Sequence, residues 1–290
     1  LATQYAIRLA ANFQLSKYVI GLLIVAVISI LPETFIAINA SLKGVPAVGL
    51  GTLFGSNVAD LTLVFAVIII LSGRKNIKIE SKILNNNVVY PFLLLIPIIL
   101  GFDGYYSRIE GAALIIAGSI FYYFAFKNGN DEAPAEKKKG PWQKNSALLI
   151  LSLITLLIGS HFTVISATDL AHNLGVAPVL IAMLIIGVGT TIPELLFSLN
   201  AVKKYNDSLA VGDILGTVLA DATVVVGILA IINPFFFPQK IIYVAGMFML
   251  LASFILGYLM RTGKILSQKE GIFLFSFWIM FVLTEYFINK

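Results

Sequence analysis

Four acidic residues of this chain stand inside long apolar segments: Glu33, Asp60, Glu194 and Asp221. A charged side chain at the centre of a membrane helix costs about 2.5–3.5 kcal/mol on insertion scales, so such residues indicate a function. Hydroxyl side chains accompany them: Ser29, Ser56, Thr190, Thr191 and Thr217. The set offers only oxygen ligands, which suit Ca²⁺, Na⁺ and Mg²⁺, whereas zinc and copper prefer nitrogen or sulfur. We therefore predict a site for hard cations.

These residues belong to an internal repeat with a constant offset of 161 positions. The repeat pairs the following residues: Ser29 with Thr190, Pro32 with Pro193, Glu33 with Glu194, Asn39 with Asn200, Lys43 with Lys204, Gly51 with Gly212, Gly55 with Gly216, Ser56 with Thr217, Ala59 with Ala220 and Asp60 with Asp221. So many matches at one offset indicate a structural repeat. The four carboxylates should therefore form one two-fold set.

Composition places this set in a membrane. The 290-residue chain is 59% hydrophobic and only 12% charged, whereas a soluble domain is about a quarter charged. A helix needs about 20 apolar residues to cross ~30 Å of hydrocarbon. Nine segments meet this requirement: 18–42, 47–72, 86–102, 109–127, 146–171, 177–202, 209–233, 240–260 and 270–288. Because these runs lack the alternation of membrane strands, we predict an all-α integral membrane protein.

The repeat extends this prediction to ten helices. The segment 1–15 has the character of a helix end, which implies a first helix that is mostly absent from this sequence. Five helices in each repeat would give the two halves opposite orientations, as in inverted-repeat transporters. The first repeat would cover 1–127, a polar linker 128–145, and the second repeat 146–290.

The basic residues orient the protein. With the linker in the cytoplasm, only four of the 20 lysines and arginines lie on the other side: Lys43, Arg108, Lys240 and Lys290. The positive-inside rule then predicts a multi-pass protein of the cell membrane with an extracytoplasmic C-terminus. This distribution accounts for the net charge of +5 without a nucleic-acid partner. Cysteine is absent, so disulfides and thiolate metal sites are excluded.

Prolines and glycines should shape the site. Pro32 and Pro193 each remove a helical hydrogen bond and leave carbonyls available as ligands. Gly55 and Gly216 allow close helix approach, which would bring each aspartate towards the kinked helix of the glutamate. Asp213 is either a peripheral ligand or a charge at the rim of the site.

At these residues the sequence resembles the cation/Ca²⁺ exchanger superfamily, most closely the prokaryotic Na⁺/Ca²⁺ exchangers. The two α-repeats of that superfamily carry G-T-S-L-P-E, followed by G-N-x-x-G-S-x-x-x-[ND]. The corresponding segments here are ISILPE at 28–33, GTLFGSNVAD at 51–60, GTTIPE at 189–194 and GDILGTVLAD at 212–221.

The resemblance implies a role for each site residue. Glu33 and Glu194 would be central Ca²⁺ ligands, with help from the backbone at Ser29 and Thr190, and Asp60 and Asp221 would line the middle site. One flanking Na⁺ site would use Ser29 and Ser56, and the other would use Thr190, Thr191 and Thr217. Sliding of the first and sixth helices would alternate access, so the helix at 146–171 would be mobile. No prosthetic group is implied, and a monomer would suffice.

Three residues depart from the superfamily pattern. Ile28 and Ile30 replace a glycine and a hydroxyl residue, so the first-repeat Na⁺ site loses a ligand. Asp60 stands where an amide is usual, which adds a charge or a proton. The predicted function is therefore Ca²⁺/Na⁺ antiport by alternating access, with H⁺-driven or mixed Ca²⁺/cation antiport as the alternative.

Two other classes compete with antiport. The segment 211–213 faintly resembles the glycine–aspartate motif of intramembrane aspartyl proteases, but an enzyme leaves Glu33, Glu194 and the repeat unexplained. A passive cation channel seldom needs four buried carboxylates in one two-fold set. We therefore predict a transporter without enzymatic activity.

Overall fold

The computed structural model describes residues 26–79, 89–129 and 142–289. The predicted end of a first helix and most of the predicted linker lie outside these residues. The first repeat contains α3 (Ala26–Ser29), α4 (Leu31–Leu42), α5 (Pro46–Ala59), η2 (Asp60–Val64), α6 (Phe65–Leu71), α8 (Tyr90–Leu100) and α9 (Arg108–Gly129). The second repeat contains α10 (Trp142–Leu174), α11 (Pro178–Ile181), η3 (Ala182–Ile186), α12 (Gly187–Lys203), α13 (Asp207–Ala220), η4 (Asp221–Val225), α14 (Val226–Ile232), η5 (Ile241–Gly246), α15 (Met247–Arg261) and α16 (Gln268–Asn289).

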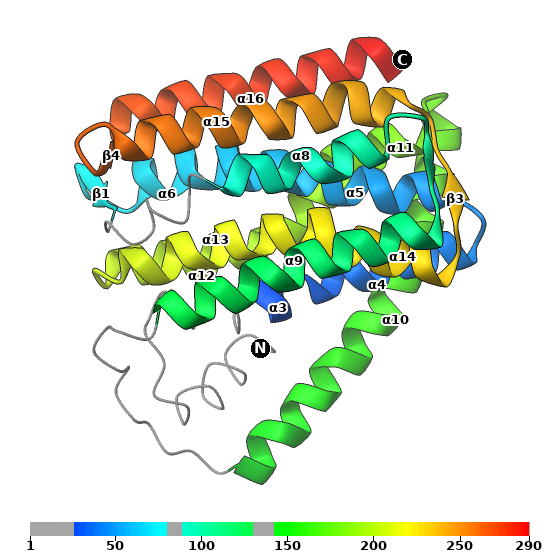
Figure 1. Cartoon of the computed structure of the whole chain (residues 1–290), viewed down its shortest axis with the longest axis horizontal. Coiled ribbons are helices and arrows are strands. Elements are labelled where there is room, and N and C mark those ends of the chain that lie inside the picture. Colours follow the sequence, from blue (N-terminus) through cyan, green and yellow to red (C-terminus); the bar gives the residue numbers. More distant parts are fainter. Residues whose placement is uncertain (1–25, 80–88, 130–141, 290) are drawn as a thin grey trace.

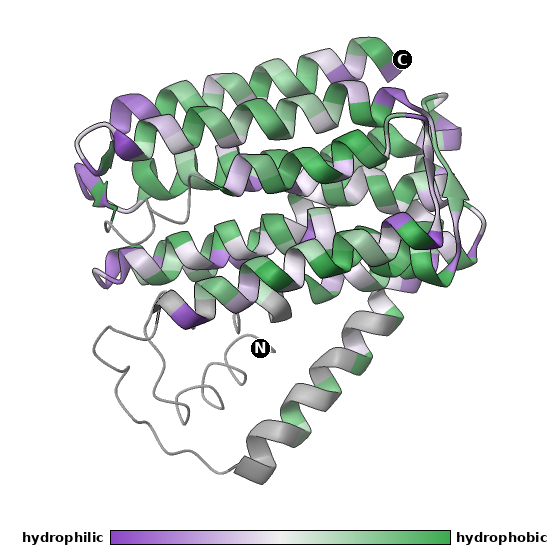
Figure 2. Ribbon diagram, viewed as in Figure 1, coloured by the Kyte–Doolittle hydropathy of each residue, from purple (hydrophilic) through white to green (hydrophobic). Residues whose placement is uncertain are grey.

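The fold is an all-helical integral membrane protein, as predicted. Long helices lie side by side, with apolar residues along their middles and hydrophilic residues at their ends (Figures 1 and 2). Among the described residues, six segments are long and apolar enough to cross a bilayer: 46–71, 108–125, 178–203, 207–232, 241–261 and 268–289. The other three predicted spans coincide with α3–α4, α8 and α10.

Burial separates the central helices from those that face lipid. In the 18-residue apolar stretch of Pro46–Leu71 and of Asp207–Ile232, 83% of the residues are buried, whereas in that of Gln268–Asn289 only 22% are buried although it is also strongly apolar. Apolar side chains that are exposed on a helix of this length need a hydrocarbon environment. Consequently α5–α6 and α13–α14 form the interior, and α16 lies at the periphery.

The internal repeat is visible in the helix boundaries. The elements α5, η2 and α6 begin and end 161 residues before α13, η4 and α14. Even the π-helical turns recur, with Asp60 and Asp221 as their first residues. The constant offset therefore reflects repeated three-dimensional structure.

Contacts between the element ends demonstrate that the repeats are inverted. Arg74, beyond the end of α6, bonds Asp207 at the start of α13, while Asn233 at the end of α14 donates to Ser41 near the start of α5. The two central segments are thus antiparallel (Figure 1).

Two short strand pairs follow the same symmetry. The strand β1 (Asn76–Lys78) pairs with β4 (Ile265–Ser267), and β2 (Tyr105–Tyr106) pairs with β3 (Phe235–Phe236). Each pair joins a connection of one repeat to a connection of the other, at opposite ends of the bundle (Figure 1). The pairs therefore hold the two repeats together outside the apolar interior.

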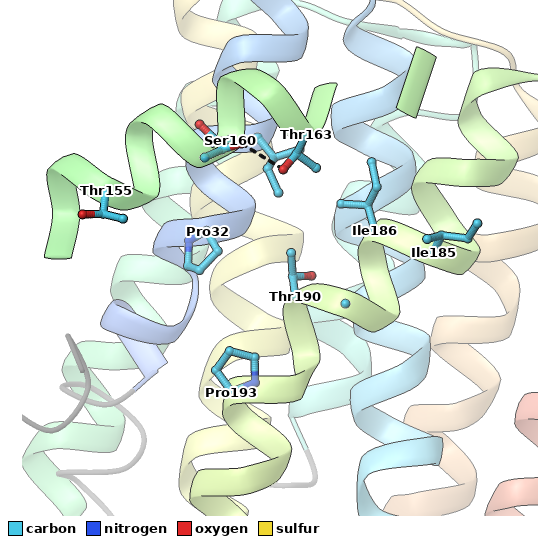
Figure 3. A pocket seen from close by; sticks show the side chains of 11 residues that line it. Pro32, Thr155, Ser160, Thr163, Ile185, Ile186, Thr190 and Pro193 are labelled. Carbon is cyan, nitrogen blue, oxygen red and sulfur yellow. Dashed lines mark hydrogen bonds between the residues drawn. The ribbon is translucent and has the colours of Figure 1, made fainter. Parts of the chain in front are cut away.

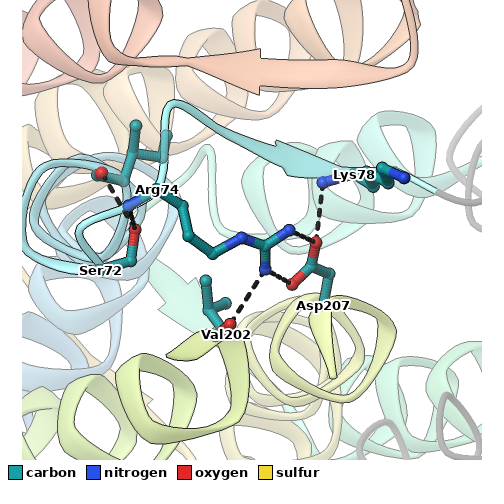
Figure 4. A network of polar contacts seen from close by, with 6 residues as sticks. Ser72, Arg74, Lys78, Val202 and Asp207 are labelled. Carbon is teal, nitrogen blue, oxygen red and sulfur yellow. Dashed lines mark hydrogen bonds and ion pairs between the residues drawn. The ribbon is translucent and has the colours of Figure 1, made fainter. Parts of the chain in front are cut away.

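One polar network reinforces the end that carries β1 and β4. Arg74 forms a two-pronged ion pair with Asp207 and also donates to the carbonyl of Val202 at 2.9 Å (Figure 4). The backbone N–H of Lys78 donates to the same carboxylate at 2.9 Å. The guanidinium carbon of Arg74 lies over the ring of Tyr205, 4.5 Å from the ring centroid. These contacts connect α6, β1, α12 and α13.

Candidate functional site

Glu33 and Glu194 follow interruptions of the regular α-helix. In the first repeat the helix breaks at Ile30, between α3 and α4, and Pro32 stands in the first turn of α4. In the second repeat the π-helical turn η3 precedes α12, and α12 continues through Pro193. Among the described residues, the helix is therefore broken at Ile30 in the first repeat but continuous at the equivalent Thr191 in the second.

Asp60 and Asp221 each begin a π-helical turn in the most buried helices of the fold. Such turns are rare and frequently mark functional sites, because they disturb the regular hydrogen-bond ladder and change the direction of neighbouring side chains. Gly55 lies one turn before Asp60 and packs directly against η3, where an added Cβ would be 2.5 Å from the carbonyl oxygen of Met183. Close approach at Gly55 agrees with its predicted role.

All four predicted carboxylates are fully buried, with at most 1% exposure: Glu33, Asp60, Glu194 and Asp221. Among the described residues, none of their eight carboxylate oxygens has a hydrogen-bond partner. Buried polar groups in folded proteins are nearly always paired, so each orphaned oxygen needs an explanation. An ion or a proton bound during function supplies one.

Electrostatic contacts connect these side chains into one cluster. Glu194 interacts with Glu33, Asp60 and Asp221, and it also interacts with Asp213. Like charges in a low dielectric repel strongly unless cations or protons neutralise them. In the described part of the chain, however, no three acidic or histidine side chains already form a metal-holding group.

The predicted hydroxyl ligands differ in how their hydroxyl groups are hydrogen-bonded. Thr190 and Thr191 donate to carbonyls of their own helix at 2.9 Å, and Ser56 donates to Leu53 at 3.0 Å. Those hydroxyl oxygens keep lone pairs that can bind a cation. The hydroxyl of Thr217 is buried and lacks a partner among the described residues.

Ser29 makes a different contact. Its hydroxyl lies 3.4 Å from Oδ1 of Asp213, and the hydroxyl of Ser198 lies 3.2 Å from Oδ2. Asp213 is fully buried, so the rim position considered above is wrong.

A cavity of about 460 Å³ lies between α10, α4, η3 and α12, and the predicted ligand Thr190 is among its lining residues. Pro32 and Pro193 both line it, together with the partly exposed Thr190 (Figure 3). On α10 the hydroxyls of Thr155 and Thr163 each bond a carbonyl of that helix. The remaining lining residues are Ile36, Gly159, Ser160, Ile185, Ile186 and Gly189.

The α10 side of this cavity was not recognised in the sequence. Its lining residues Thr155, Gly159 and Thr163 recur every four positions and therefore share one face of the helix. That periodicity inside the apolar segment 146–171 was the available signal. Ser198 was also missed, because a single serine in a helix carries no pattern.

Comparisons with known proteins identify the family of the chain. Residues 2–127 and 144–287 match the sodium/calcium exchanger protein family. The chain is 31% identical over 216 residues to an uncharacterized membrane protein of Methanocaldococcus jannaschii, which covers 74% of this chain and 70% of that protein. It is 24% identical over 331 residues to the sodium/calcium exchanger MaX1 of Methanosarcina acetivorans, covering 98% and 93% of the two chains.

A solved structure has the same fold. The sodium-calcium exchanger NCX_Mj, soaked with 100 mM Na⁺ and 10 mM Sr²⁺, superimposes with a TM-score of 0.73 at 25% identity. The alignment covers 96% of this chain and 90% of that protein. The likeness therefore extends over both repeats.

Proposed function

Since the chain belongs to the sodium/calcium exchanger protein family, we propose that it is a secondary active antiporter that exchanges Ca²⁺ for Na⁺. One observation carries the assignment of the site: four buried carboxylates from both repeats interact electrostatically with one another and lack hydrogen-bond partners among the described residues. A soluble fold would rarely tolerate such a set, and a bilayer makes it still more costly. Glu33 and Glu194 are the proposed central ligands, and Asp60 and Asp221 complete the set.

Exchange depends on the electrostatic free energy of the empty site, which is unfavourable because its carboxylates repel one another. Ca²⁺ takes six to eight oxygens, which carboxylates, hydroxyls and carbonyls at the helix interruptions would supply. When Ca²⁺ leaves, the carboxylates repel until Na⁺ or H⁺ replaces it. The carrier would therefore change its conformation only when loaded, which couples the two fluxes.

Alternating access is proposed to involve movement of α10 against α4. These helices share a buried apolar cluster. Two polar contacts also join them: Asn39 donates to the hydroxyl of Ser160 at 2.8 Å, and Lys43 donates to the carbonyl of His161 at 3.4 Å. Each is a single hydrogen bond beside the cavity, and a hydrogen bond of this kind contributes little net free energy. Both can therefore break when α10 slides. One chain holds the whole carboxylate set, so the proposed unit of transport is the monomer.

Proton coupling is the second candidate, and Asp60 is the residue that favours it. This carboxylate occupies the position of the family's usual amide, is fully buried and interacts electrostatically with Glu33. A group that must be neutralised in the empty carrier can take up H⁺ instead of Na⁺. Driving Ca²⁺ uptake with each ion separately distinguishes the candidates.

The test uses the protein reconstituted in proteoliposomes. Uptake of ⁴⁵Ca²⁺ is measured with an outward Na⁺ gradient and, at matched voltage, with an outward H⁺ gradient. We expect the Na⁺ gradient to drive uptake. If only the H⁺ gradient drives uptake, H⁺ is the coupling ion instead of Na⁺. If the Ca²⁺ flux does not depend on either gradient, the protein is a channel.

Glu194→Gln tests the site itself. Loss of one central carboxylate should abolish Ca²⁺ transport and leave the fold intact, as judged by size-exclusion chromatography. Glu285→Gln is the matched control, because Glu285 is a buried carboxylate on the peripheral helix α16, where it accepts from Asn289 at 2.6 Å. Full transport by Glu194→Gln would refute the proposed site.

A further inference from the structure

The two halves of the site differ at two pairs of equivalent positions. Ile30 corresponds to Thr191, so the first repeat has an apolar side chain where the second has a hydroxyl. Asp213 corresponds to Thr52, so the second repeat has a carboxylate where the first has a hydroxyl. The Ile30 side chain is buried in the apolar core and offers no ligand.

The structure brings these two differences to the same place. Ile30 follows Ser29 directly, and α3, which ends at Ser29, packs against α13. Ser29 and Asp213 are 184 residues apart in the chain, yet the hydroxyl of one is 3.4 Å from the carboxylate of the other. The carboxylate gained in the second repeat therefore contacts Ser29, the residue that directly precedes Ile30.

Three buried oxygen-bearing side chains meet at this point. Ser29, Ser198 and Asp213 are each at most 7% exposed, and both serines hydrogen-bond the carboxylate. Ser198 has a second acceptor, the carbonyl of Ala210 at 3.4 Å, so its bond to Asp213 is replaceable.

Two carboxylates that interact with Asp213 lack hydrogen-bond partners in the described part of the chain, which indicates that a cation binds near Asp213. Asp213 interacts electrostatically with Asp60 and Glu194. Neither of those buried carboxylates has a hydrogen-bond partner in the described structure. A cation held beside Asp213 would reduce the repulsion among all three.

We propose that Asp213 is a cation ligand that, with Ser29 and Ser198, forms a charged subsite for a monovalent cation on the first-repeat side of the exchange site. Its carboxylate replaces the hydroxyl that Ile30 lacks. One negative charge with two neutral hydroxyls suits Na⁺ better than Ca²⁺, for which tight sites use several carboxylates. The subsite related by the repeat, with Thr190, Thr191 and Thr52, would remain neutral. This inference rests on the proposed Na⁺/Ca²⁺ exchange.

Asp213→Asn tests the ligand role, because it removes the charge and keeps an acceptor for the Ser29 hydroxyl. The Na⁺ concentration for half-maximal exchange should rise roughly tenfold, as expected when one charged ligand is lost. Exchange of ⁴⁵Ca²⁺ for unlabelled Ca²⁺ without Na⁺ should be retained, because the central glutamates are intact. A purely structural role for Asp213 would impair both activities together.

A compensating substitution makes the test sharper. Ile30→Thr restores the hydroxyl that the second repeat has at Thr191, so adding it to Asp213→Asn should return the Na⁺ dependence towards that of the parent. Glu285→Gln is again the control for removal of a buried carboxylate. Unchanged Na⁺ dependence in Asp213→Asn, or loss of Ca²⁺/Ca²⁺ exchange with it, would overturn the proposal.

Direct binding separates this proposal from the proposed function. Equilibrium binding of ²²Na⁺ to the purified protein should be weaker in Asp213→Asn than in the parent protein. This result would support the subsite even if the parent protein did not transport Ca²⁺, a failure that would refute only the proposed exchange. If Asp213→Asn does not fold, Asp213→Thr takes its place, because it copies the Thr52 of the other half. Failure of both variants to fold would identify Asp213 as a structural residue and overturn the ligand assignment.

Discussion

At the scale of single residues, Asp207 illustrates how one carboxylate can serve several elements. It pairs with Arg74, accepts from the backbone of Lys78, and stands in the first turn of α13, where a negative charge stabilises the helix dipole. The two side chains of the ion pair are only 14% and 9% exposed, so water competes weakly with their contacts. Asp207 thus stabilises the junction of the two repeats without belonging to the cation site.

We expect Asp207→Ala to lower the free energy of unfolding by roughly 2–4 kcal/mol, because Arg74 would remain partly buried without its counter-charge. Thermal unfolding in detergent would measure the change. Asp169→Ala on α10 is the control, since Asp169 is exposed. Equal melting temperatures for the two variants would contradict the role assigned to Asp207.

At the scale of elements, the closeness of α5 and η3 depends on Gly55. An added Cβ at Gly55 would meet the backbone of Met183 at 2.5 and 2.6 Å, and a backbone cannot move aside as a flexible side chain can. The same contact keeps Asp60, one turn further along, next to the second repeat. The glycine therefore determines how far apart the two halves of the site lie.

Gly55→Ala should reduce the yield of folded protein and lower stability by about 1–3 kcal/mol, the usual cost of overpacking. Gly159→Ala on α10 is the matched control, because nothing lies within 4 Å of its added Cβ. Fluorescence-detected size-exclusion chromatography with a thermal challenge would compare them. Identical profiles would mean that α5 and η3 can separate without cost.

At the scale of the whole molecule, inversion of the repeats should place equivalent residues on opposite sides of the membrane. Lys43 and Lys204 are related by the 161-residue offset, and both are exposed. Lys204 lies near the end that carries β1 and β4, which also holds Arg74, Lys75, Lys78 and Lys264. The concentration of basic residues there agrees with a cytoplasmic end.

Lys204→Cys should be labelled by a membrane-impermeant thiol reagent only from the cytoplasmic side, and Lys43→Cys only from the opposite side. The chain has no cysteine of its own, so the unsubstituted protein is a clean control. Labelling of both positions from the same side would contradict the proposed topology.

The amino-acid sequence alone determined the helical membrane fold and the repeat, and it predicted a site at four carboxylates that the structure buries. These features are readable because a bilayer demands long apolar segments, and because charged residues inside such segments recur with proline, glycine and hydroxyl neighbours at one offset. The element boundaries repeat at that same offset in the structure, from α5 and α13 to α6 and α14.

Only the tertiary structure decided which distant residues meet. The contact of Ser29 with Asp213 joins positions 184 apart, and the pairing of Arg74 with Asp207 joins positions 133 apart. Both result from the packing of the two antiparallel repeats; the repeat predicted their opposite orientations, but no local pattern specifies which side chains meet. The sequence left Asp213 either at the rim or among the ligands, because burial depends on what packs against a helix and not on the helix itself.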